Sequence, residues 1–324
     1  MTFLKKYYLK LFFKQWSVGI LENSLEEIIR QKKTDLSFKW MPLNNIDTSY
    51  ADPCIFYSNK GEVNILAEEF TTGELDGRIC LFKYDKTKGF STPETILKNG
   101  THFSYPLIYK ENNKSHVLVE NAFDGPLVSY EYDEVREEIG DGKVISNLPI
   151  LDATILKAQG KYWLFGTLLG NGRFSKLHIY YADNFSGPYK AHAANPVKNN
   201  LNGSRPAGNF FEVDGCIYRP SQNCGAYYGE SITINKILKL SETEFAEEEY
   251  MVIKANNNGE YNMGIHTINA AGNYIVVDGQ KGHFQPFMQL IRAVKRLFRK
   301  NKNKLSCVAY YLHSFNFEEY AVAC

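Results

Sequence analysis

Apolar and polar residues alternate with a period near two over most of this chain of 324 residues. Such alternation over short runs is typical of β-strands with one buried face. Gly, Asn and Asp residues interrupt it about every 8–12 residues, which is typical of all-β folds. The clearest apolar runs lie at 63–67, 116–119, 161–165 and 274–277. Helical periodicity is confined to about 2–14, 24–32 and 285–302, so we expect an all-β protein with a few helical additions.

A repeat becomes visible when the turns are aligned. Each unit has a short polar stretch, an apolar run, a turn and a second apolar run. One polar or aromatic residue, which we call the marker, holds the same position in each unit: Asp52, Tyr105, Asp152, Arg205 and His266. The markers are 53, 47, 53 and 61 residues apart. Five units of about four strands each predict a five-bladed β-propeller, whereas a β-sandwich would not explain the recurring marker.

The terminal segments differ from the repeats in composition. Residues 15–20 read as one more strand, which could complete the last blade and close the ring. We therefore divide the chain into a basic amphipathic segment (1–14), the propeller (15–284), a basic amphipathic helix (285–304) and a C-terminal strand or tail (305–324).

The innermost strand of each blade lines the central channel, so the five markers are expected to converge on one funnel. Each marker also has a structural interpretation: Asp52 precedes Pro53 in a common turn sequence, and Asp152 could stabilise a bend. Their common phase in successive repeats favours a shared functional site.

Asp52-Pro53 in the first unit and Asp152 in the third resemble the five-bladed propeller glycosidases, the family 43 glycoside hydrolases. That resemblance implies that Asp52 is a general base and that Asp152 orients the site and tunes pKa values. The general acid of that family opens the fourth blade, where this chain has Arg205. A hydrolase would therefore need another acid, because the leaving group must be protonated. Glu230 is the first candidate, and Glu68, Glu69 and Glu120 are others.

A second resemblance covers the chain from about Trp16 to Gly279. The chain resembles the N-terminal propeller domain of plant glucosamine inositolphosphorylceramide transferases and related bacterial proteins of polysaccharide loci. The segments that carry it include 51–53, 102–106, 152–155, 187–189, 195–197, 205–208, 218–224, 228–229, 266–269 and 278–279. It implies carbohydrate chemistry around a nucleotide sugar or a lipid-linked glycan.

The residue types fit such a site. Arg205 and Arg219 have the fork geometry that suits a diphosphate, and Asp52 or Asp152 could deprotonate an acceptor hydroxyl. The other candidates for substrate contacts are His102, Tyr105, Glu120, Gln222, Tyr228, His266 and Asp278. The structural alternatives are an arginine–aspartate ion pair between blades, a satisfied channel histidine at His266 and a backbone bond from Gln222.

The chain lacks the cofactor motifs G-x-G-x-x-G and P-loop, the nucleophile elbow G-x-S-x-G and an obvious D-x-D pair. No cofactor is expected, and a divalent metal stays an open alternative. The six scattered cysteines form no C-x-x-C pair, which argues against zinc and for reduced thiols in a cytoplasm. The N-terminus lacks the features of a secretory signal, and the chain lacks a run of 18 apolar residues.

The net charge of +1 argues against a nucleic-acid partner, but charge is segregated along the chain. Residues 1–14 carry four lysines and 287–304 carry seven basic residues, with no acid in either, so the remainder has a net charge of −10. A cationic amphipathic helix predicts contact with an anionic membrane surface, although its apolar face could instead dock on the propeller. The residues proposed for membrane contact are Arg292, Lys295, Arg296, Arg299 and Lys300.

We therefore expect a glycosyltransferase of cell-surface polysaccharide or glycolipid biosynthesis, peripherally attached to the inner face of the membrane. Its funnel would bind the sugar, and its acceptor would be lipid-linked. The alternatives are a propeller glycoside hydrolase that uses Asp52, Asp152 and a displaced glutamate, and a non-catalytic glycan-binding module.

Overall fold

The computed structural model describes residues 12–72, 76–121, 123 and 125–286. The chain divides into two compact units, Gln15–Lys281 and the chain ends outside it, and each is described by itself. Among the described residues of the end unit, the rings of Phe12 and Phe284 lie 5.4 Å apart between centroids. Everything below concerns Gln15–Lys281, apart from element bounds that run into the end unit.

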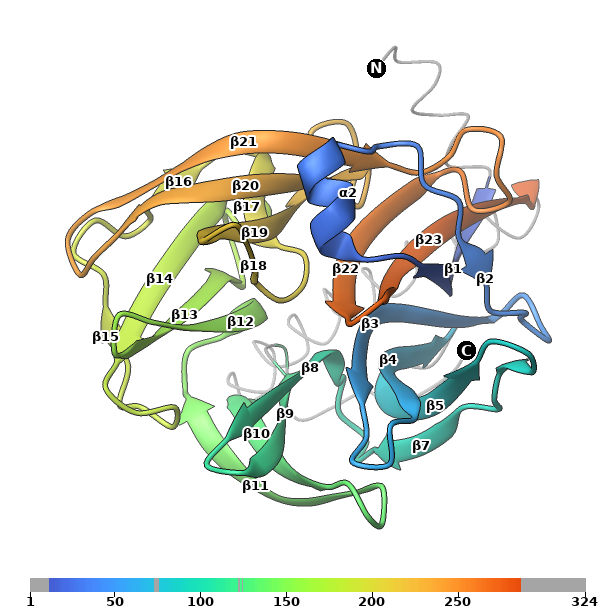
Figure 1. Cartoon of the computed structure of the whole chain (residues 1–324), viewed down its shortest axis with the longest axis horizontal. Coiled ribbons are helices and arrows are strands. Elements are labelled where there is room, and N and C mark those ends of the chain that lie inside the picture. Colours follow the sequence, from blue (N-terminus) through green and yellow to red (C-terminus); the bar gives the residue numbers. More distant parts are fainter. Residues whose placement is uncertain (1–11, 73–75, 122, 124, 287–324) are drawn as a thin grey trace, which may run out of the picture. The chain divides into compact units, whose positions relative to one another are not determined.

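This unit is a five-bladed β-propeller built from five antiparallel sheets around a central axis, which confirms the predicted fold (Figure 1). Blade 1 contains β3 (Thr48–Tyr57), β4 (Val63–Thr71), β5 (Arg78–Asp85), β6 (Gly89–Phe90) and β7 (Glu94–Leu97). Blade 2 contains β8 (Ser104–Glu111), β9 (Lys114–Glu120), β10 (Leu127–Asp133) and β11 (Glu138–Ser146).

Blade 3 contains β12 (Ile150–Ala158), β13 (Lys161–Leu168), β14 (Lys176–Ala182), β15 (Lys190–Ala191) and β16 (Lys198–Asn199). Blade 4 contains β17 (Asn202–Pro206), β18 (Phe211–Val213), β19 (Cys216–Asn223), β20 (Ser231–Leu240) and β21 (Phe245–Lys254). Blade 5 contains β22 (Gly264–Ala271), β23 (Tyr274–Phe284), β1 (Phe12–Glu22) and β2 (Lys39–Trp40).

Blade 5 closes the ring. Its sheet runs β2-β1-β23-β22, so the first strand of the described residues is inserted beside the last of them. Gly19 of β1 pairs with Trp40 of β2, and the N–H of Met41 continues the ladder by donating to the carbonyl of Val18. The prediction that residues 15–20 complete the last blade is therefore confirmed.

Each inner strand carries a β-bulge beside its marker. The pairing register shifts between Ala51 and Cys54 in β3, and between Leu151 and Thr154 in β12. Corresponding shifts occur at 104–107 in β8, 202–206 in β17 and 265–268 in β22. Three markers have positive φ angles, +52° at Asp52, +48° at Tyr105 and +51° at Asp152. A bulge re-aims a side chain, and here the same irregularity recurs at the same phase of every blade.

Apolar strand residues fill the spaces between blades. One buried cluster joins Trp163 and Phe165 of blade 3 to Leu240 of blade 4, and another joins Ile20 of blade 5 to Ile65 and Phe82 of blade 1. These side chains are 0–8% exposed. The alternating pattern of the sequence thus buries both faces of each blade against its neighbours.

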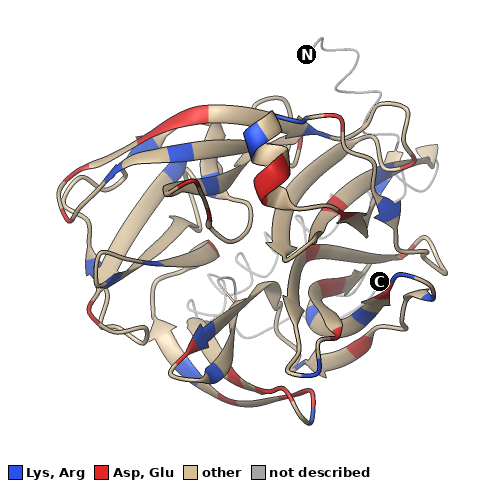
Figure 2. Ribbon diagram, in the orientation of Figure 1, with Lys and Arg blue, Asp and Glu red and all other residues tan. Residues whose placement is uncertain are grey.

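The helical predictions have a mixed outcome. The segment predicted at 24–32 forms α2 (Leu25–Gln31), whose first turn is acidic and whose last turn is basic, as Figure 2 shows in red and blue. Such charges complement the helix dipole. The helix expected at 2–14 is wrong for its last three residues, because β1 begins at Phe12.

The described residues give no support to added terminal helices, since α2 is the one α-helix among their elements. Residues 1–11 and 287–324 lie outside the described part, and with them the basic helix and the C-terminal strand or tail. The proposed segment boundaries therefore stay predictions. No helix of the described chain is long and apolar enough to cross a membrane.

Candidate functional site

Four of the five markers meet in a group of polar side chains at the centre of the propeller. We call the following residues the central cluster: Asp52, Glu68, Glu120, Asp152, Arg205, Gln222, His266 and Asp278. Most are deeply buried, with 6% exposure at Asp52 and 3% at Asp152. The side chains of Arg205 and Asp52 reach the surface, with 11% and 8% of their area exposed.

One half of the cluster is an ion pair between blades 3 and 4. Nη2 of Arg205 donates to Oδ1 of Asp152 at 2.9 Å, and its Nε donates to Oδ2 of the same carboxylate. Nε2 of Gln222 donates to Oδ2 of Asp152 at 2.6 Å and to the carbonyl of Pro206 at 3.0 Å. Burial raises the pKa of Asp152, and the charge of Arg205 opposes that rise. The bidentate pair uses the Nε–Nη2 edge of the guanidinium, which is an edge that could otherwise bind a diphosphate.

The other half is a charged triad between blades 5 and 1. Nε2 of His266 lies 3.2 Å from Oδ1 of Asp52, and its Nδ1 lies 2.8 Å from Oδ2 of Asp278. Burial acts to lower the pKa of His266, but Asp278 and Asp52 outweigh it and hold that pKa well above its ordinary value. Burial likewise acts to raise the pKa of Asp52, but His266 outweighs it and holds that pKa below its ordinary value. The two neighbouring carboxyl groups therefore favour the protonated form of His266.

The same triad is the group that could hold a metal. Its carboxylate and imidazole ligand atoms all lie within 4.8 Å of one another. Carboxylate oxygens with one imidazole suit a divalent cation, but His266 would first have to release its proton. In this structure the imidazolium already balances the two carboxylates.

Two further carboxyl groups, at the ends of second strands, complete the cluster. Burial raises the pKa of Glu120 to about 8, and the charge of Asp152 adds to the rise. Burial also raises the pKa of Glu68 well above its ordinary value, with a further contribution from Asp52. Oε1 of Glu68 lies 3.3 Å from Nε2 of His102. The raised pKa values of both glutamates favour their protonated forms, which can donate protons.

Carboxylates of one blade also hold the bulges of the next. The backbone N–H of Asp52 donates to Oδ2 of Asp278 at 3.0 Å, and the backbone N–H of Asp152 donates to Oε2 of Glu120 at 2.6 Å. In both cases the acceptor comes from the second strand of the preceding blade. These hydrogen bonds stabilise a left-handed backbone conformation that non-glycine residues rarely adopt.

Aromatic rings lie beside the cluster where it reaches the surface. The ring of Tyr228 is 5.1 Å from that of His266, and the guanidinium of Arg205 lies 5.3 Å from the centre of the Tyr228 ring. The ring of Trp16 is 4.3 Å from His266, and Phe174 lies 5.5 Å from the Arg205 guanidinium. Tyr228 is 37% exposed. Rings beside charged hydrogen-bonding groups form a surface suited to the two faces of a sugar.

Several predicted site residues have other roles. Arg219 is 1% exposed and pairs with Glu247 at 2.7 Å, while its Nη2 also donates to the carbonyl of Gly203. These contacts lie within blade 4 and favour a structural role for Arg219, so its expected contact with donor phosphates stays a prediction. Tyr105 is 2% exposed, and its hydroxyl contacts Thr154 and the N–H of Gly208. Its ring and hydroxyl join blades 2, 3 and 4, so the expected substrate contact of Tyr105 also stays a prediction.

Gln222 and Asp278 are both 0% exposed, so they position other cluster members and do not contact a ligand directly. Glu230 is half-buried, and its Oε2 accepts the N–H of Ala226 within the same loop. The buried glutamates that are candidates for a general acid are therefore Glu68 and Glu120, and not Glu230.

Sequence reasoning did not single out Trp16 or Phe174 as site residues. Trp16 could have been found from the closing strand, because ring closure brings that strand beside the marker His266. Phe174 lies in the loop between β13 and β14, and its sequence position carried no signal of the site.

The fold is that of a five-bladed propeller with a carboxylate-rich centre, and solved structures of propeller glycoside hydrolases share the fold. A family 62 α-L-arabinofuranosidase from Podospora anserina matches with a TM-score of 0.54 and 12% identity, over 76% of this chain and 94% of that one. A family 117 glycoside hydrolase from Zobellia galactanivorans matches with a TM-score of 0.51 and 14% identity, over 85% and 92%. A family 43 protein from Bacillus licheniformis gives 0.50 and 16%, over 69% and 51%. At these identities the likeness is one of fold.

The chain belongs to the family described as glucosamine inositolphosphorylceramide transferase 1, N-terminal, which matches residues 44–272. This confirms the resemblance found in the sequence. The Arabidopsis thaliana glucosamine inositolphosphorylceramide transferase 1 is 29% identical over 261 residues, which are 72% of this chain and 34% of that protein. The protein of the same name from Oryza sativa subsp. japonica is 30% identical over 156 residues, 47% of this chain and 21% of that protein. The chain thus spans about a third of the length of the Arabidopsis relative.

Proposed function

We propose that this protein acts in glycosyl transfer during the assembly of a glycolipid or a cell-surface polysaccharide, and that a sugar binds at the central cluster beside Tyr228. Membership of the family supports the class of reaction, since the curated relatives are named as transferases acting on a ceramide glycolipid. Those relatives are much longer than the matched region. The activity of the whole relative is therefore a proposal for this chain.

The observation that carries the proposal is a central cluster in which Asp52 contacts His266 at 3.2 Å, while Glu120 and Glu68 are buried among other carboxyl groups. His266 lowers the pKa of Asp52, whereas burial raises the pKa of Glu120 to about 8 and that of Glu68 well above its ordinary value. Among the described residues, the side-chain contacts of Asp52 with Thr267 and His266 both involve Oδ1. Oδ2 is therefore the oxygen that faces a ligand.

In the proposed reaction an acceptor hydroxyl attacks the anomeric carbon of the donor sugar. The bond from that carbon to the donor's leaving oxygen breaks, and Oδ2 of Asp52 accepts the hydroxyl proton. Glu120 or Glu68 donates a proton to the departing oxygen. Such a division of roles between carboxyl groups of different pKa is general in sugar chemistry.

The charges of the central cluster determine which part of the donor can bind there. Both arginines predicted to hold phosphates are engaged by carboxylates, Arg205 by Asp152 and Arg219 by Glu247. Three aspartates of the cluster face Arg205 and His266, so the cluster favours a neutral or cationic sugar over a free diphosphate. We therefore place the sugar, and not the phosphates of a nucleotide sugar, at the cluster.

A second candidate function is glycoside hydrolysis. Glu120, whose pKa is raised beside Asp152, can act as the protonated general acid. Arg205 cannot fill that role. In that reaction water replaces the acceptor hydroxyl, and the same groups move the same protons. Release of reducing sugar from an aryl glycoside, without transfer to a second sugar, would favour this candidate.

The test combines binding and turnover. We expect oligosaccharides, or the sugar part of a nucleotide sugar, to raise the melting temperature of the protein. Asp52→Asn should keep binding and lower transfer to a lipid-linked acceptor by at least 100-fold, the scale of general base catalysis. Asp183→Asn, at an aspartate whose side chain is 77% exposed, is the matched control and should change neither. Binding without any transfer or hydrolysis would leave a glycan-binding module and overturn the enzymatic proposal.

Membrane attachment is a separate proposal that rests on sequence. The cationic segments 1–14 and 287–304 would bind anionic headgroups at the inner face of the membrane and hold the chain near a lipid-linked acceptor. We expect the protein to float with phosphatidylserine liposomes and not with neutral ones. Replacing Arg292, Lys295, Arg296, Arg299 and Lys300 with glutamine should release it. Unchanged flotation of that variant would contradict the role of this segment.

A further inference from the structure

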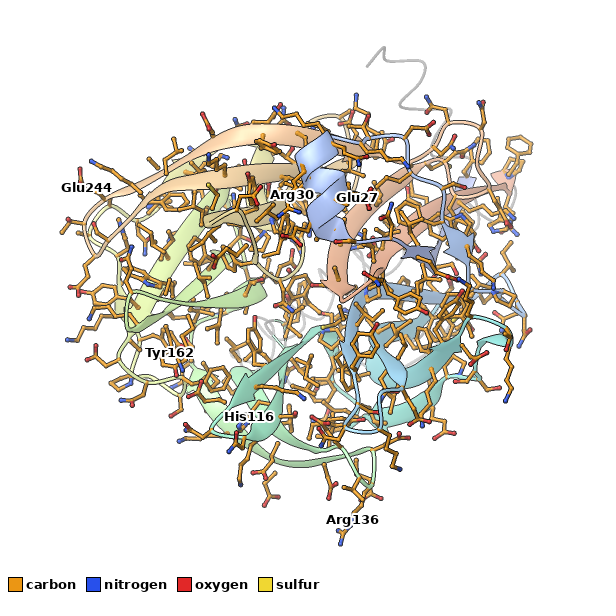
Figure 3. The ribbon with its side chains drawn as sticks, viewed as in Figure 1. Glu27, Arg30, His116, Arg136, Tyr162 and Glu244 are labelled. Carbon is orange, nitrogen blue, oxygen red and sulfur yellow. The ribbon has the colours of Figure 1, made fainter. Side chains whose placement is uncertain are left out.

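A groove between blades 2 and 3 lies away from the central cluster. It has a volume of about 330 Å³ and is lined from both blades, by His116 and Ser129 on one side and by Tyr162 and Phe185 on the other. Figure 3 labels His116 and Tyr162, which come from β9 and β13 of these neighbouring blades. His116 precedes Glu120 by four residues on β9, so about 13 Å of strand separates the groove from the central cluster.

The apolar part of the groove is the aromatic ring of Phe185, which neighbouring rings hold in place. Phe185 is half-buried, and its ring contacts those of Tyr109, His116 and Tyr162 with centroids 5.8, 5.5 and 6.0 Å away. Three supporting rings hold Phe185 in one orientation, and its remaining exposed surface is flat and apolar. A flat ring of this kind binds the C–H face of a sugar ring with little loss of side-chain entropy.

The floor carries a hydroxyl group that nothing satisfies. Ser129 is 3% exposed, and its Oγ has no hydrogen-bond partner among the described residues. A buried polar atom without a partner costs free energy, so such an atom beside a cavity indicates a group that a ligand or a water completes. Ser129 lines the groove, and a hydroxyl donor or acceptor on a bound molecule could reach it.

The rim carries charges of both signs. Glu111 contacts Lys157 at 3.2 Å, and Glu131 contacts Lys114 at 2.9 Å. Lys143 on one blade donates to Ser186 on the other at 3.1 Å. Asp141 also lines the groove, so its three acids are matched in number by Lys114, Lys157 and Lys143. The groove therefore has no net charge that would select a phosphate or a cation. Carboxylate and amide groups instead surround the flat ring of Phe185. They can form hydrogen bonds with the hydroxyl groups around an uncharged sugar.

We propose that this groove is a second saccharide site, which binds one or two uncharged sugar rings of a glycan with Phe185 as the stacking surface and Ser129 as a hydrogen-bond partner. Its volume is at the lower end of small-ligand pockets, which start at about 300 Å³. The site is independent of the chemistry proposed for the central cluster, because its residues come from the other ends of the strands. It would hold a glycan chain on the propeller while another part of the chain reaches the cluster.

The test uses the full chain and calorimetric titration with neutral oligosaccharides of three to six units. Phe185→Ala should weaken binding by at least 10-fold. Ser129→Ala removes a hydroxyl with no partner, so it should leave the free energy of unfolding unchanged and weaken binding by about 3- to 10-fold. Phe123→Ala, at an exposed ring outside the groove, is the matched control and should bind like the original protein.

Each outcome decides the proposal. Weakened binding in both groove variants, with binding unchanged in Phe123→Ala, supports the second site even if the central cluster proves inactive. The proposal is overturned if no neutral saccharide of the panel binds, if only charged sugars bind, or if Ser129→Ala and Phe185→Ala bind as tightly as the original protein.

Discussion

Asp278 and Asp52 are 226 residues apart in sequence, and the backbone N–H of Asp52 donates to Oδ2 of Asp278 at 3.0 Å. Oδ1 of the same carboxylate accepts the N–H groups of His266 and Thr267, both at 2.9 Å. One buried side chain thus holds the inner strands of the last and first blades together and sets the charge of His266. Ring closure and the electrostatics of the site depend on the same carboxylate.

Replacing Asp278 should therefore destabilise the whole propeller. Asp278→Asn removes a negative charge beside a buried imidazolium and one of the acceptors of three N–H groups. We expect a loss of about 3–5 kcal/mol in the free energy of unfolding, the scale for breaking a buried ion pair. Urea unfolding measures it, with Asp183→Asn as an exposed control expected to change stability by less than about 0.5 kcal/mol. A loss equal to that of the control would refute the role of Asp278.

Stability should fall as pH rises through neutrality. The pKa of Glu120 is raised to about 8 in the folded chain, so its contribution is fully present below its unfolded value and is lost as pH rises through about 8. The raised pKa of His266 acts in the same direction. Between pH 5 and 9 the original protein should lose about 2–4 kcal/mol more than Glu120→Gln, which keeps an acceptor for Asp152 but cannot ionise.

Melting curves across this pH range measure that difference. Glu131→Gln, at an exposed glutamate, is the control and should follow the original protein. Parallel curves for the original protein and Glu120→Gln would show that Glu120 is ionised throughout.

Arg219 should matter for stability and not for sugar binding. Arg219→Ala leaves Lys198 as the remaining partner of the buried Glu247 carboxylate. The loss of the arginine should lower the free energy of unfolding by about 3–5 kcal/mol. Arg136→Ala, at an arginine whose side chain is 74% exposed, should be nearly neutral. Denaturant unfolding gives the stabilities, and titration with the ligand of the central cluster gives the affinities. A stable Arg219→Ala protein with weakened binding would restore Arg219 to the site.

Tyr228 should act as a stacking surface for the sugar at the central cluster. Removing its ring in Tyr228→Ala should weaken binding by about 10-fold, in keeping with the 0.5–1.5 kcal/mol of an aromatic contact. Tyr228→Phe keeps the ring and serves as the matched variant, with affinity within about two-fold of the original. Equal affinities for the two variants would place the sugar elsewhere.

The blade count could be predicted from the sequence because it depends on local patterns. Strand alternation and turn residues repeat about every 50 residues, and the marker phase coincides with the bulge of each inner strand. The three left-handed markers are visible only in the structure, since the two Asp residues and the Tyr at this phase share no common side-chain chemistry. What they share is a backbone position.

The partners within the site could not be predicted in the same way. Whether Arg205 faces a phosphate or Asp152 depends on the spacing between two blades, which no local pattern encodes. Arg219 was assigned to the site by residue type, and only its pairing with Glu247 on an outer strand favours a structural role. Glu68 and Glu120 gain their chemistry from burial beside other carboxylates, so their pKa values are properties of the assembled ring.

The closing blade also determines when the protein can become functional during synthesis. Trp16 is synthesised 250 residues before its neighbour His266. Until β22 and β23 emerge, the nascent propeller is an open arc whose strand edges are unpaired and prone to association. Asp52 meanwhile lacks Asp278 and His266, so neither the first bulge nor the charge of the site is set. Blade 5 must therefore be synthesised before the central cluster can assemble, and any truncation before blade 5 abolishes the site as well as the ring.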